Sequence, residues 1–249
     1  MASERDRNKV HKLSLKGSAK LVAEFFEYSI HSILFQRGVY PADDFTAVKK
    51  YGLNMLVSAD DQVKAYIKKI MSQLNKWMLG GKISKLVVVI TDKETGEHVE
   101  RWQFDVEIFS KPSRSKSSQK HADNENASPK YAHLSSQTSE VTLFPPTNAV
   151  VPFLSSMSSP AQPEKTEKQI QEEIQAIFRQ ITASVTFLPM LDGNCTFNVL
   201  VYADADSEVP LEWGDSDSKE IKNGEKVQLR SFSTNSHRVD TLVSYRLAE

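Results

Sequence analysis

The feature that most constrains this chain is a pair of strand-like runs joined by a short turn, between residues 85 and 108. The first run, KLVVVITD, is a β-branched stretch of the kind that occupies a central strand. The turn KETGE offers Gly96, which adopts positive φ without a steric penalty. The second run, ERWQFDVEI, alternates apolar with polar residues, so one face is buried and the other meets water. This hairpin therefore predicts the middle of a sheet, with a wet face formed by Arg101, Gln103, Asp105 and Glu107.

Three amphipathic helices are predicted from apolar residues that recur at three-and-four spacing. The first spans residues 18–36. The second begins at Ser58, which is placed to cap its free backbone N–H groups, and ends at a pair of glycines. The third spans residues 164–183. Each helix has one apolar face, and that face needs a sheet or another helix to cover it.

The remaining segments differ sharply in character. Residues 110–163 hold seven of the ten prolines and many serines, which predicts a disordered insertion. An apolar tract inside it, VTLFPPTNAVVPFLSSM, is interpreted as exposed chain in preference to a partner motif. The run CTFNVLVYAD is strand-like, the segment after Asp204 is acidic and irregular, and the runs KVQLRSFST and HRVDTLVSYRL predict a terminal hairpin. This pattern indicates an α+β domain with three helices packed on one mostly antiparallel sheet.

Several classes of function find no support in the sequence. The net charge is −1, so no basic field draws the chain to nucleic acid, and no apolar run is long enough for a membrane helix. The six histidines lack metal-ligand spacing, and His31 is interpreted as a solvated residue on the polar side of the first helix. The single cysteine, Cys195, fits a reducing compartment, which we expect to be the cytosol or nucleus. No nucleophile elbow, P-loop or dinucleotide fingerprint occurs, so no enzyme, metal or cofactor is predicted.

A binding module is the class that remains, and exposed strands give it a mechanism. A partner peptide can add to the free edge of a sheet through backbone hydrogen bonds. Such an edge must be covered when it is empty, because it otherwise invites aggregation. The acidic segment and the terminal hairpin are the predicted cover.

Four long stretches of the sequence resemble a known family. LKGSAKLVAEFFEYSIHSILFQRGVYP, KLVVVITDKETGEHVERWQFD, FRQITASVTFLP and LRSFSTNSHRV are similar to the mitotic arrest deficient two family of HORMA-domain spindle assembly checkpoint proteins, with a fungal-like pattern. The resemblance covers nearly the whole chain outside residues 110–163, where the family has a shorter connection. It implies a single HORMA domain over residues 1–249, with a flexible arm at 1–15 and a mobile C-terminal safety belt at 204–249.

The resemblance also implies roles for individual residues. A client peptide would add beside the strand TFNVLVYAD, with Phe197, Val199, Leu200 and Tyr202 lining its site. Arg179, Gln180 and Phe187 would form the contact between an open and a closed copy. Leu15 would pack differently in the two states.

Partners follow from the same resemblance. The expected clients are the coiled-coil kinetochore receptor and the activator of the anaphase-promoting complex, with no nucleic acid and no membrane. Capture of the activator would delay anaphase, and the expected locations are the nucleus, kinetochore and cytoplasm. A HORMA adaptor in translesion DNA synthesis or on the meiotic chromosome axis is the alternative, and its peptide preference would distinguish it.

Overall fold

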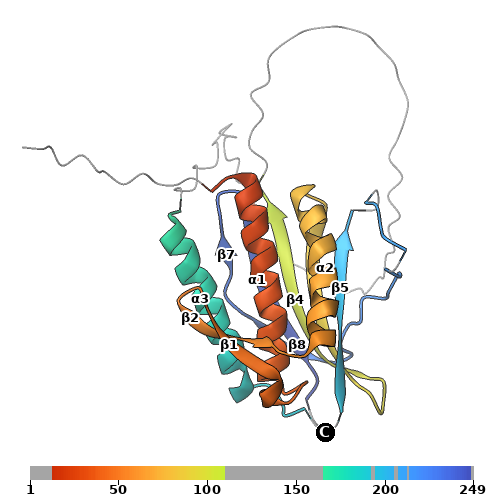
Figure 1. Cartoon of the computed structure of the whole chain (residues 1–249). Helices are drawn as coiled ribbons and strands as arrows, with labels where there is room; N and C mark the ends of the chain where they lie inside the picture. The colour runs from red at the N-terminus through yellow and green to blue at the C-terminus, as the bar shows by residue number, and fades with distance from the viewer. Residues whose placement is uncertain (1–12, 110–164, 192–193, 205–206, 212, 248–249) are drawn as a thin grey trace, which may run out of the picture. The chain divides into compact units, whose positions relative to one another are not determined.

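The computed structural model describes residues 13–109, 165–191, 194–204, 207–211 and 213–247. These residues belong to one compact unit, shown in colour in Figure 1. The predicted arm lies mostly outside the described residues, and the predicted insertion at 110–163 lies wholly outside them. Within the described part of the chain, no helix has both the length and the apolar character that crossing a bilayer requires.

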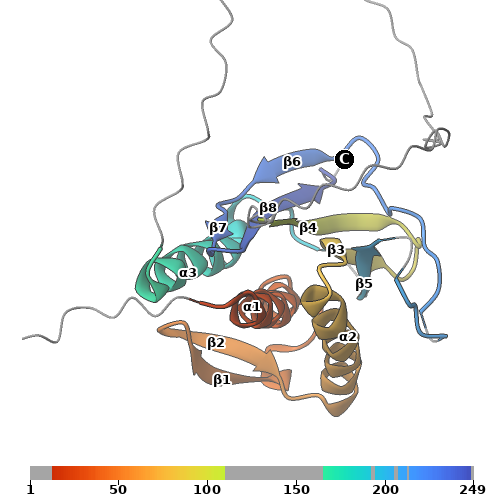
Figure 2. The same cartoon turned by 90° about the horizontal axis from the view of Figure 1, so that it is seen from above.

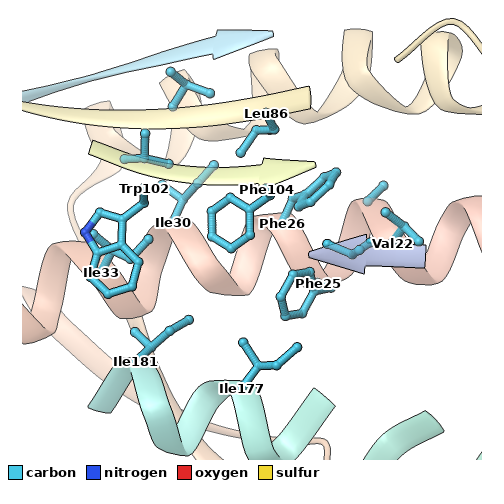
Figure 3. Close-up of a cluster of buried hydrophobic side chains, with 14 of the residues drawn as sticks. Val22, Phe25, Phe26, Ile30, Ile33, Leu86, Trp102, Phe104, Ile177 and Ile181 are labelled. Atoms are coloured by element: carbon cyan, nitrogen blue, oxygen red, sulfur yellow. The ribbon is translucent and has the colours of Figure 1, made fainter. Parts of the chain in front are cut away.

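The central helix is α1, Leu15–Gln36, which begins three residues earlier than the sequence predicts. Ser14 provides its N-cap by accepting a hydrogen bond from the Gly17 N–H at 3.0 Å. Figure 3 shows α1 side chains meeting the sheet on one side and the third helix on the other. The fully buried members of this core include Phe25, Phe26, Ile30, Ile33, Leu86, Trp102, Phe104, Ile177 and Ile181. The predicted apolar face of the first helix is thus confirmed.

The main sheet contains the predicted hairpin and runs in the order β5-β3-β4-β8-β6. Strands β3, Ile83–Asp92, and β4, His98–Ile108, pair antiparallel at its centre. The other strands are β5, Cys195–Ala203, and β6, Glu225–Gln228, at the two ends of the sheet, and β8, His237–Tyr245, between β4 and β6. The short β7, Phe232–Ser233, also pairs with β8. Figure 2 shows the three helices on one face of this sheet. The predicted α+β architecture is therefore confirmed, with a mostly antiparallel sheet.

The other two helices flank α1. Helix α2, Asp61–Leu79, is capped by Asp60, whose carboxylate accepts from the Val63 N–H at 2.8 Å. The prediction that Ser58 is the cap was wrong. Helix α3, Glu167–Ala183, starts with a capping box made by Thr166 and Gln169.

Short elements complete the unit. They are the 3-10 turns η1, Ala42–Asp44, and η2, Ser184–Thr186, and a separate hairpin of β1, Phe45–Lys50, and β2, Leu53–Ser58. The apolar pattern of residues 45–58 did not predict this hairpin, which lies on the side of α1 away from the main sheet (Figure 2).

His31 is buried, which contradicts its interpretation as a solvated residue. Its Nδ1 accepts a hydrogen bond from the Ser58 N–H at 3.2 Å, at the end of β2. Burial lowers the pKa of His31 to about 4, because the charged imidazolium would lose its hydration. The histidine therefore joins α1 to β2 in its neutral form.

This lowered pKa predicts an acid-dependent loss of stability. The unfolded chain binds the proton at a pKa near 6.5, so the contribution of His31 is complete above that pH and is lost as the pH falls towards 4. Each pKa unit corresponds to about 1.4 kcal/mol. In His31→Asn, whose amide oxygen can replace Nδ1, we expect the unfolding free energy to depend less steeply on pH between 6.5 and 4.5. Urea unfolding at a series of pH values would measure it, and equal slopes for the two proteins would contradict the assignment.

A buried ion pair ties the end of α1 to the sheet. Arg37 donates from Nε to both carboxylate oxygens of Glu100, at 2.8 and 3.1 Å. Trp102 Nε1 donates to the same carboxylate, and Arg37 Nη2 donates to the Pro189 carbonyl. Burial raises the pKa of the Glu100 carboxyl, while Arg37 and Trp102 act in the opposite direction. This cluster fixes α1, β4 and the chain after α3 to one another.

The predicted wet face of β4 is only partly exposed. Glu107 meets solvent as predicted, whereas Arg101 has only 1% of its surface exposed. Arg101 lies on the face away from the helices, opposite to the one that carries buried Trp102. A segment distant in the sequence must therefore cover that face at Arg101.

Candidate functional site: the β5 edge and the C-terminal segment

Strand β5 lies at one end of the main sheet and has a strand partner on one side only. Among the described residues its partner is β3, in a register that sets Val199 opposite Val88. The other side of β5 is therefore an edge without a paired strand in the described part of the chain. Such an edge presents backbone donors and acceptors to an added strand.

The direction of the main-chain groups on β5 follows from the hydrogen bonds at its two ends. The Asn194 carbonyl accepts from the Lys93 N–H, and the Asp204 N–H donates to the Lys82 carbonyl. The main-chain groups of both of these even-numbered residues therefore point towards β3. Because the direction of the main-chain groups alternates along an antiparallel strand, the N–H and C=O groups of the odd-numbered residues point away from β3, to the outer edge. A hydrogen bond between the Val199 main chain and the Tyr66 hydroxyl agrees with this direction. Further along the strand, Val201 and Ala203 present their main-chain groups to the outer edge.

The four predicted peptide-lining residues divide between two faces of β5. Phe197 and Val199 are buried on the helix-facing side, where the Phe197 ring meets those of Tyr40 and Tyr66. The alternation of a strand sets Leu200 and Tyr202 on the opposite face, where Lys85 Nζ lies 5.1 Å from the centre of the Tyr202 ring. The structure thus brings all four to the edge strand, but not to one surface.

A hollow of about 330 Å³ borders the N-terminal half of this edge. Tyr40, Tyr66 and Phe197 form its aromatic wall, and Asp60 adds a carboxylate. Tyr66 comes from α2, and sequence reasoning did not select it. The sequence contained one indication of its role. Tyr66 is a large aromatic residue among the polar residues of α2, and such a residue is unusual on a helix face that only meets solvent.

Residues 204–224, here named the crossing segment, connect β5 at one edge of the sheet to β6 at the other. Figure 2 shows this blue chain leaving β5 and reaching β6 on the side of the sheet away from the helices. At its start, Trp77 Nε1 donates to the Glu208 carbonyl at 3.1 Å, and the Trp77 and Trp213 rings meet edge to face at 5.1 Å. The sequence offered one signal for this anchor, an isolated tryptophan in an acidic run.

The middle of the crossing segment lies over β4. The Ser218 carbonyl accepts from Arg101 Nε at 3.1 Å, and Glu220 Oε1 is 3.3 Å from Arg101 Nη2. Ile221 then enters a buried position just before β6. Near the start of the segment, Val209 and Leu211 have exposed apolar side chains. The segment is therefore held near its start and again over β4, and its exposed apolar groups lie between the two residues that contact Trp77.

The terminal hairpin, β6 to β8, does not cover the β5 edge. Strand β8 instead pairs with β4 along nine residues, from Glu100 opposite Tyr245 to Ile108 opposite His237. The prediction that this hairpin covers the empty peptide edge is corrected by that pairing. An exposed edge strand can pair with other chains unless it is covered. Here the terminal hairpin covers the edge of β4 and not that of β5.

A buried polar cluster holds the terminal hairpin against α1. Ser18 Oγ lies 2.6 Å from both Thr234 Oγ1 and His237 Nδ1. Thr234 Oγ1 also accepts from the N–H groups of Ser236 and His237, which forms the turn before β8. Burial lowers the pKa of His237, so the ring is neutral at physiological pH. Sequence reasoning gave these residues no joint role, because Ser18 lies more than two hundred residues away.

The predicted self-contact residues occupy three different surroundings. Arg179 borders a hollow of about 290 Å³ between α1, β2 and α3, and its Nη2 donates to Gln175 Oε1. Gln180 Oε1 accepts from the Arg230 N–H, on the connection from β6 to β7. Phe187 follows η2, is 40% exposed and lies 6.5 Å from the ring of Tyr245. The structure places Arg179 and Phe187 on the surface and ties Gln180 to the C-terminal segment.

Leu15 is the first residue of α1 rather than part of the arm before it, and 56% of its surface is exposed. Its predicted role in switching stays a prediction. The acidic residues of the crossing segment form no group with metal-binding arrangement among the described residues.

Comparison with known proteins adds an independent finding. The HORMA domain family matches residues 18–237. Over 234 residues, 94% of each chain, the sequence is 49% identical to the mitotic spindle checkpoint component mad2 of Schizosaccharomyces pombe. A chain in a crystal structure of the mitotic checkpoint complex is 48% identical, with a TM-score of 0.69 over 93% of this chain and 99% of that one.

A more distant likeness shows the fold alone. The Caenorhabditis elegans protein HTP-2, solved bound to the HIM-3 closure motif, has a TM-score of 0.62 at 12% identity, over 94% of this chain and 92% of that one. The three helices and antiparallel sheet described above are therefore an arrangement shared by proteins of widely different sequence.

Proposed function

Because the chain belongs to the HORMA-domain family and, within it, to the MAD2 group of spindle checkpoint components, we propose that it acts by capturing peptide motifs of its partners. Its function is in the mitotic spindle assembly checkpoint, and the relatives' names favour this over DNA synthesis or the meiotic axis. The proposed clients are a coiled-coil kinetochore receptor and the activator of the anaphase-promoting complex. The spindle checkpoint relatives are named as regulatory components, and we propose that this chain too is not an enzyme.

The observation that carries the proposal is the position of the C-terminal strands. Because β8 occupies the β4 edge, the β5 edge keeps outward-facing backbone groups at Val201 and Ala203. A client strand can hydrogen-bond there while the crossing segment passes on its outer side. The exposed side chains of Val209 and Leu211 supply apolar surface for a client to bury.

This arrangement also predicts slow release of a captured peptide. A peptide under the crossing segment leaves only after that segment opens, so its dissociation rate is coupled to a local unfolding step. To move such an element from about 1:99 to 99:1 requires roughly 5.5 kcal/mol of differential binding. A full ladder of backbone hydrogen bonds with buried apolar side chains is of that order.

The direct test is binding of synthetic peptides to the folded full chain. Peptides from the coiled-coil receptor and from the activator are expected to bind and to dissociate slowly, whereas scrambled peptides are not. Motifs from DNA-synthesis or meiotic-axis proteins form the comparison set, because a preference for them would favour the adaptor function. Failure of both checkpoint peptides to bind would refute the proposed clients.

We further propose that an open and a closed copy associate through the surface that carries Arg179. Its guanidinium is exposed beside an apolar hollow lined by Phe35, Leu53 and Leu56, which suits a partner side chain. We place the protein in the nucleus and cytoplasm and at kinetochores, where fluorescence microscopy of a tagged chain in mitotic cells would test it.

Arg179→Glu is expected to weaken self-association at least tenfold and to leave peptide capture unchanged. The substitution reverses a surface charge whose hydrogen bond among the described residues is to Gln175 within the same helix, so the fold should persist. Analytical ultracentrifugation would measure association, and the synthetic receptor peptide would measure capture. Lys168→Glu, an exposed charge reversal at the other end of α3, is the matched control. Loss of capture together with association would mean that Arg179 is needed for the fold.

A further inference from the structure

Arg101 is a buried cation on the face of the sheet that carries no helix. Its side chain is 1% exposed, although its position in β4 points it away from the core. The neighbouring Gln103 provides one contact within β4 by accepting from Arg101 Nη1 at 2.6 Å. The other described polar partners of Arg101 come from the crossing segment.

Those partners are Ser218 and Glu220, which lie two positions apart in the crossing segment. The Ser218 carbonyl accepts from Nε at 3.1 Å, and Glu220 Oε1 forms an ion pair with Nη2 at 3.3 Å. Nη2 is buried and makes no hydrogen bond among the described groups, so the carboxylate is its counter-charge. One guanidinium therefore engages both a main-chain and a side-chain group of the crossing segment, as its planar fork of donors allows.

The backbone between these two contacts is strained. Lys219 has φ of 47°, in the left-handed region that residues with a Cβ rarely adopt. This conformation lies between the Ser218 carbonyl and the Glu220 carboxylate, both of which contact Arg101. A strained backbone conformation persists only when its surroundings hold it in place, and here contacts on both sides of Lys219 do so.

We propose that Arg101 is the positioning residue that fastens the crossing segment to the sheet and thereby sets how long a captured peptide stays bound. The second part rests on the proposed function, whereas the fastening itself does not. When the crossing segment leaves, Arg101 becomes a hydrated surface residue that still contacts Gln103. The open state therefore leaves no buried charge without a partner, which distinguishes Arg101 from the permanently buried Arg37 and makes its contacts reversible.

The test compares Arg101→Met with a control on the same sheet. Methionine keeps much of the apolar length of arginine and removes the donors. Arg238→Met is the matched control, because the ion pair that Arg238 forms among the described residues is with Asp240 on its own strand β8 and not with the crossing segment. Hydrogen exchange on the free full-length chain would follow the amides of residues 213–224 separately from those of β3.

Arg101→Met is expected to accelerate exchange in residues 213–224 about tenfold, in line with the loss of hydrogen bonds to a charged group, and to leave β3 unchanged. Glu220→Gln is expected to have a smaller effect, about twofold, because 54% of that side chain is exposed. Arg101→Lys should fall between wild type and methionine, since it retains the charge and loses the fork. Unchanged exchange in Arg101→Met would overturn the proposal, and so would an equal acceleration in β3, which would make the residue merely structural.

Peptide release provides the second readout. With a fluorescein-labelled synthetic receptor peptide, Arg101→Met is expected to raise the dissociation rate constant about tenfold, and Arg238→Met is expected to leave it unchanged. A rate constant equal to wild type despite faster exchange would overturn the link to release. If the wild-type chain captured no peptide, the proposed function would fail while the exchange result would still decide the fastening.

Discussion

Replacement of Val201 by proline is expected to weaken peptide capture at least about a hundredfold. The N–H of Val201 points to the outer edge of β5, so proline removes a donor that an added strand needs and leaves the pairing with β3 intact. The proline ring also crowds the added strand beside the lost donor, so about three ladder bonds fail to form, and three bonds of about 1 kcal/mol each correspond to more than a hundredfold. Proline is tolerated in an edge strand when its nitrogen faces outwards.

Val201→Ala separates the backbone from the side chain. Alanine keeps the N–H and loses part of a half-buried side chain, so capture should weaken only a few-fold. Fluorescence anisotropy with the receptor peptide would measure affinity, and thermal unfolding would confirm that both variants are folded. Wild-type affinity in Val201→Pro would show that clients do not use this edge. Equal losses in the two variants would assign the effect to the side chain.

Arg37→Met is expected to lower the unfolding free energy by about 3–5 kcal/mol at neutral pH. The substitution leaves the Glu100 carboxylate buried without its counter-charge, and such a group destabilises a fold far more than the pair stabilises it. The surface pair of Arg238 with Asp240 provides the control, because Arg238→Met should cost less than about 1 kcal/mol. Urea unfolding followed by tryptophan fluorescence would measure both.

The pH dependence of this variant tests the assignment. Without Arg37, burial raises the pKa of Glu100 further above its unfolded value. A raised pKa means that stability is fully present below the unfolded pKa and is lost as the pH rises, so Arg37→Met should recover stability on acidification from pH 7 towards 5. The double variant Arg37→Met with Glu100→Gln should regain part of the loss at pH 7. A deficit that does not change with pH would indicate lost packing rather than an unpaired charge.

The sequence predicted helices and strands well where buried residues recur at regular spacing within one segment. The apolar spacing of α1 and α3 and the alternation of β4 each record which side faces the core. Caps were less predictable, because Ser58 and Asp60 both offer a suitable oxygen two residues apart. The structure selects Asp60, while Ser58 gives its N–H to His31.

The candidate site was less accessible to sequence reasoning because its geometry depends on distant segments. Nothing near Arg101 in the sequence indicates that residues 218–220 cover it, and periodicity alone assigns it to solvent. His31 was misassigned for the same reason, since β2 buries the side of α1 that its own pattern leaves polar. Apart from Leu15, the residues implied by family resemblance lie on β5 and around α3. The division of Phe197 from Tyr202 between two faces of β5 became visible only in the structure.

The order of strands in the main sheet has a consequence for how the chain assembles. The hairpin of β3 and β4 joins near neighbours in sequence, whereas β8 joins β4 through partners as distant as Phe104 and Thr241. Closing such a long loop costs more chain entropy, so local pairs form early and β8 arrives late. The pairing of β5 with β3 also joins distant partners, such as Val88 and Val199, so both β5 and β8 are expected to add after the β3–β4 hairpin has formed. The early β3–β4 hairpin therefore has two free edges, and in the structure β5 occupies one of them and β8 the other.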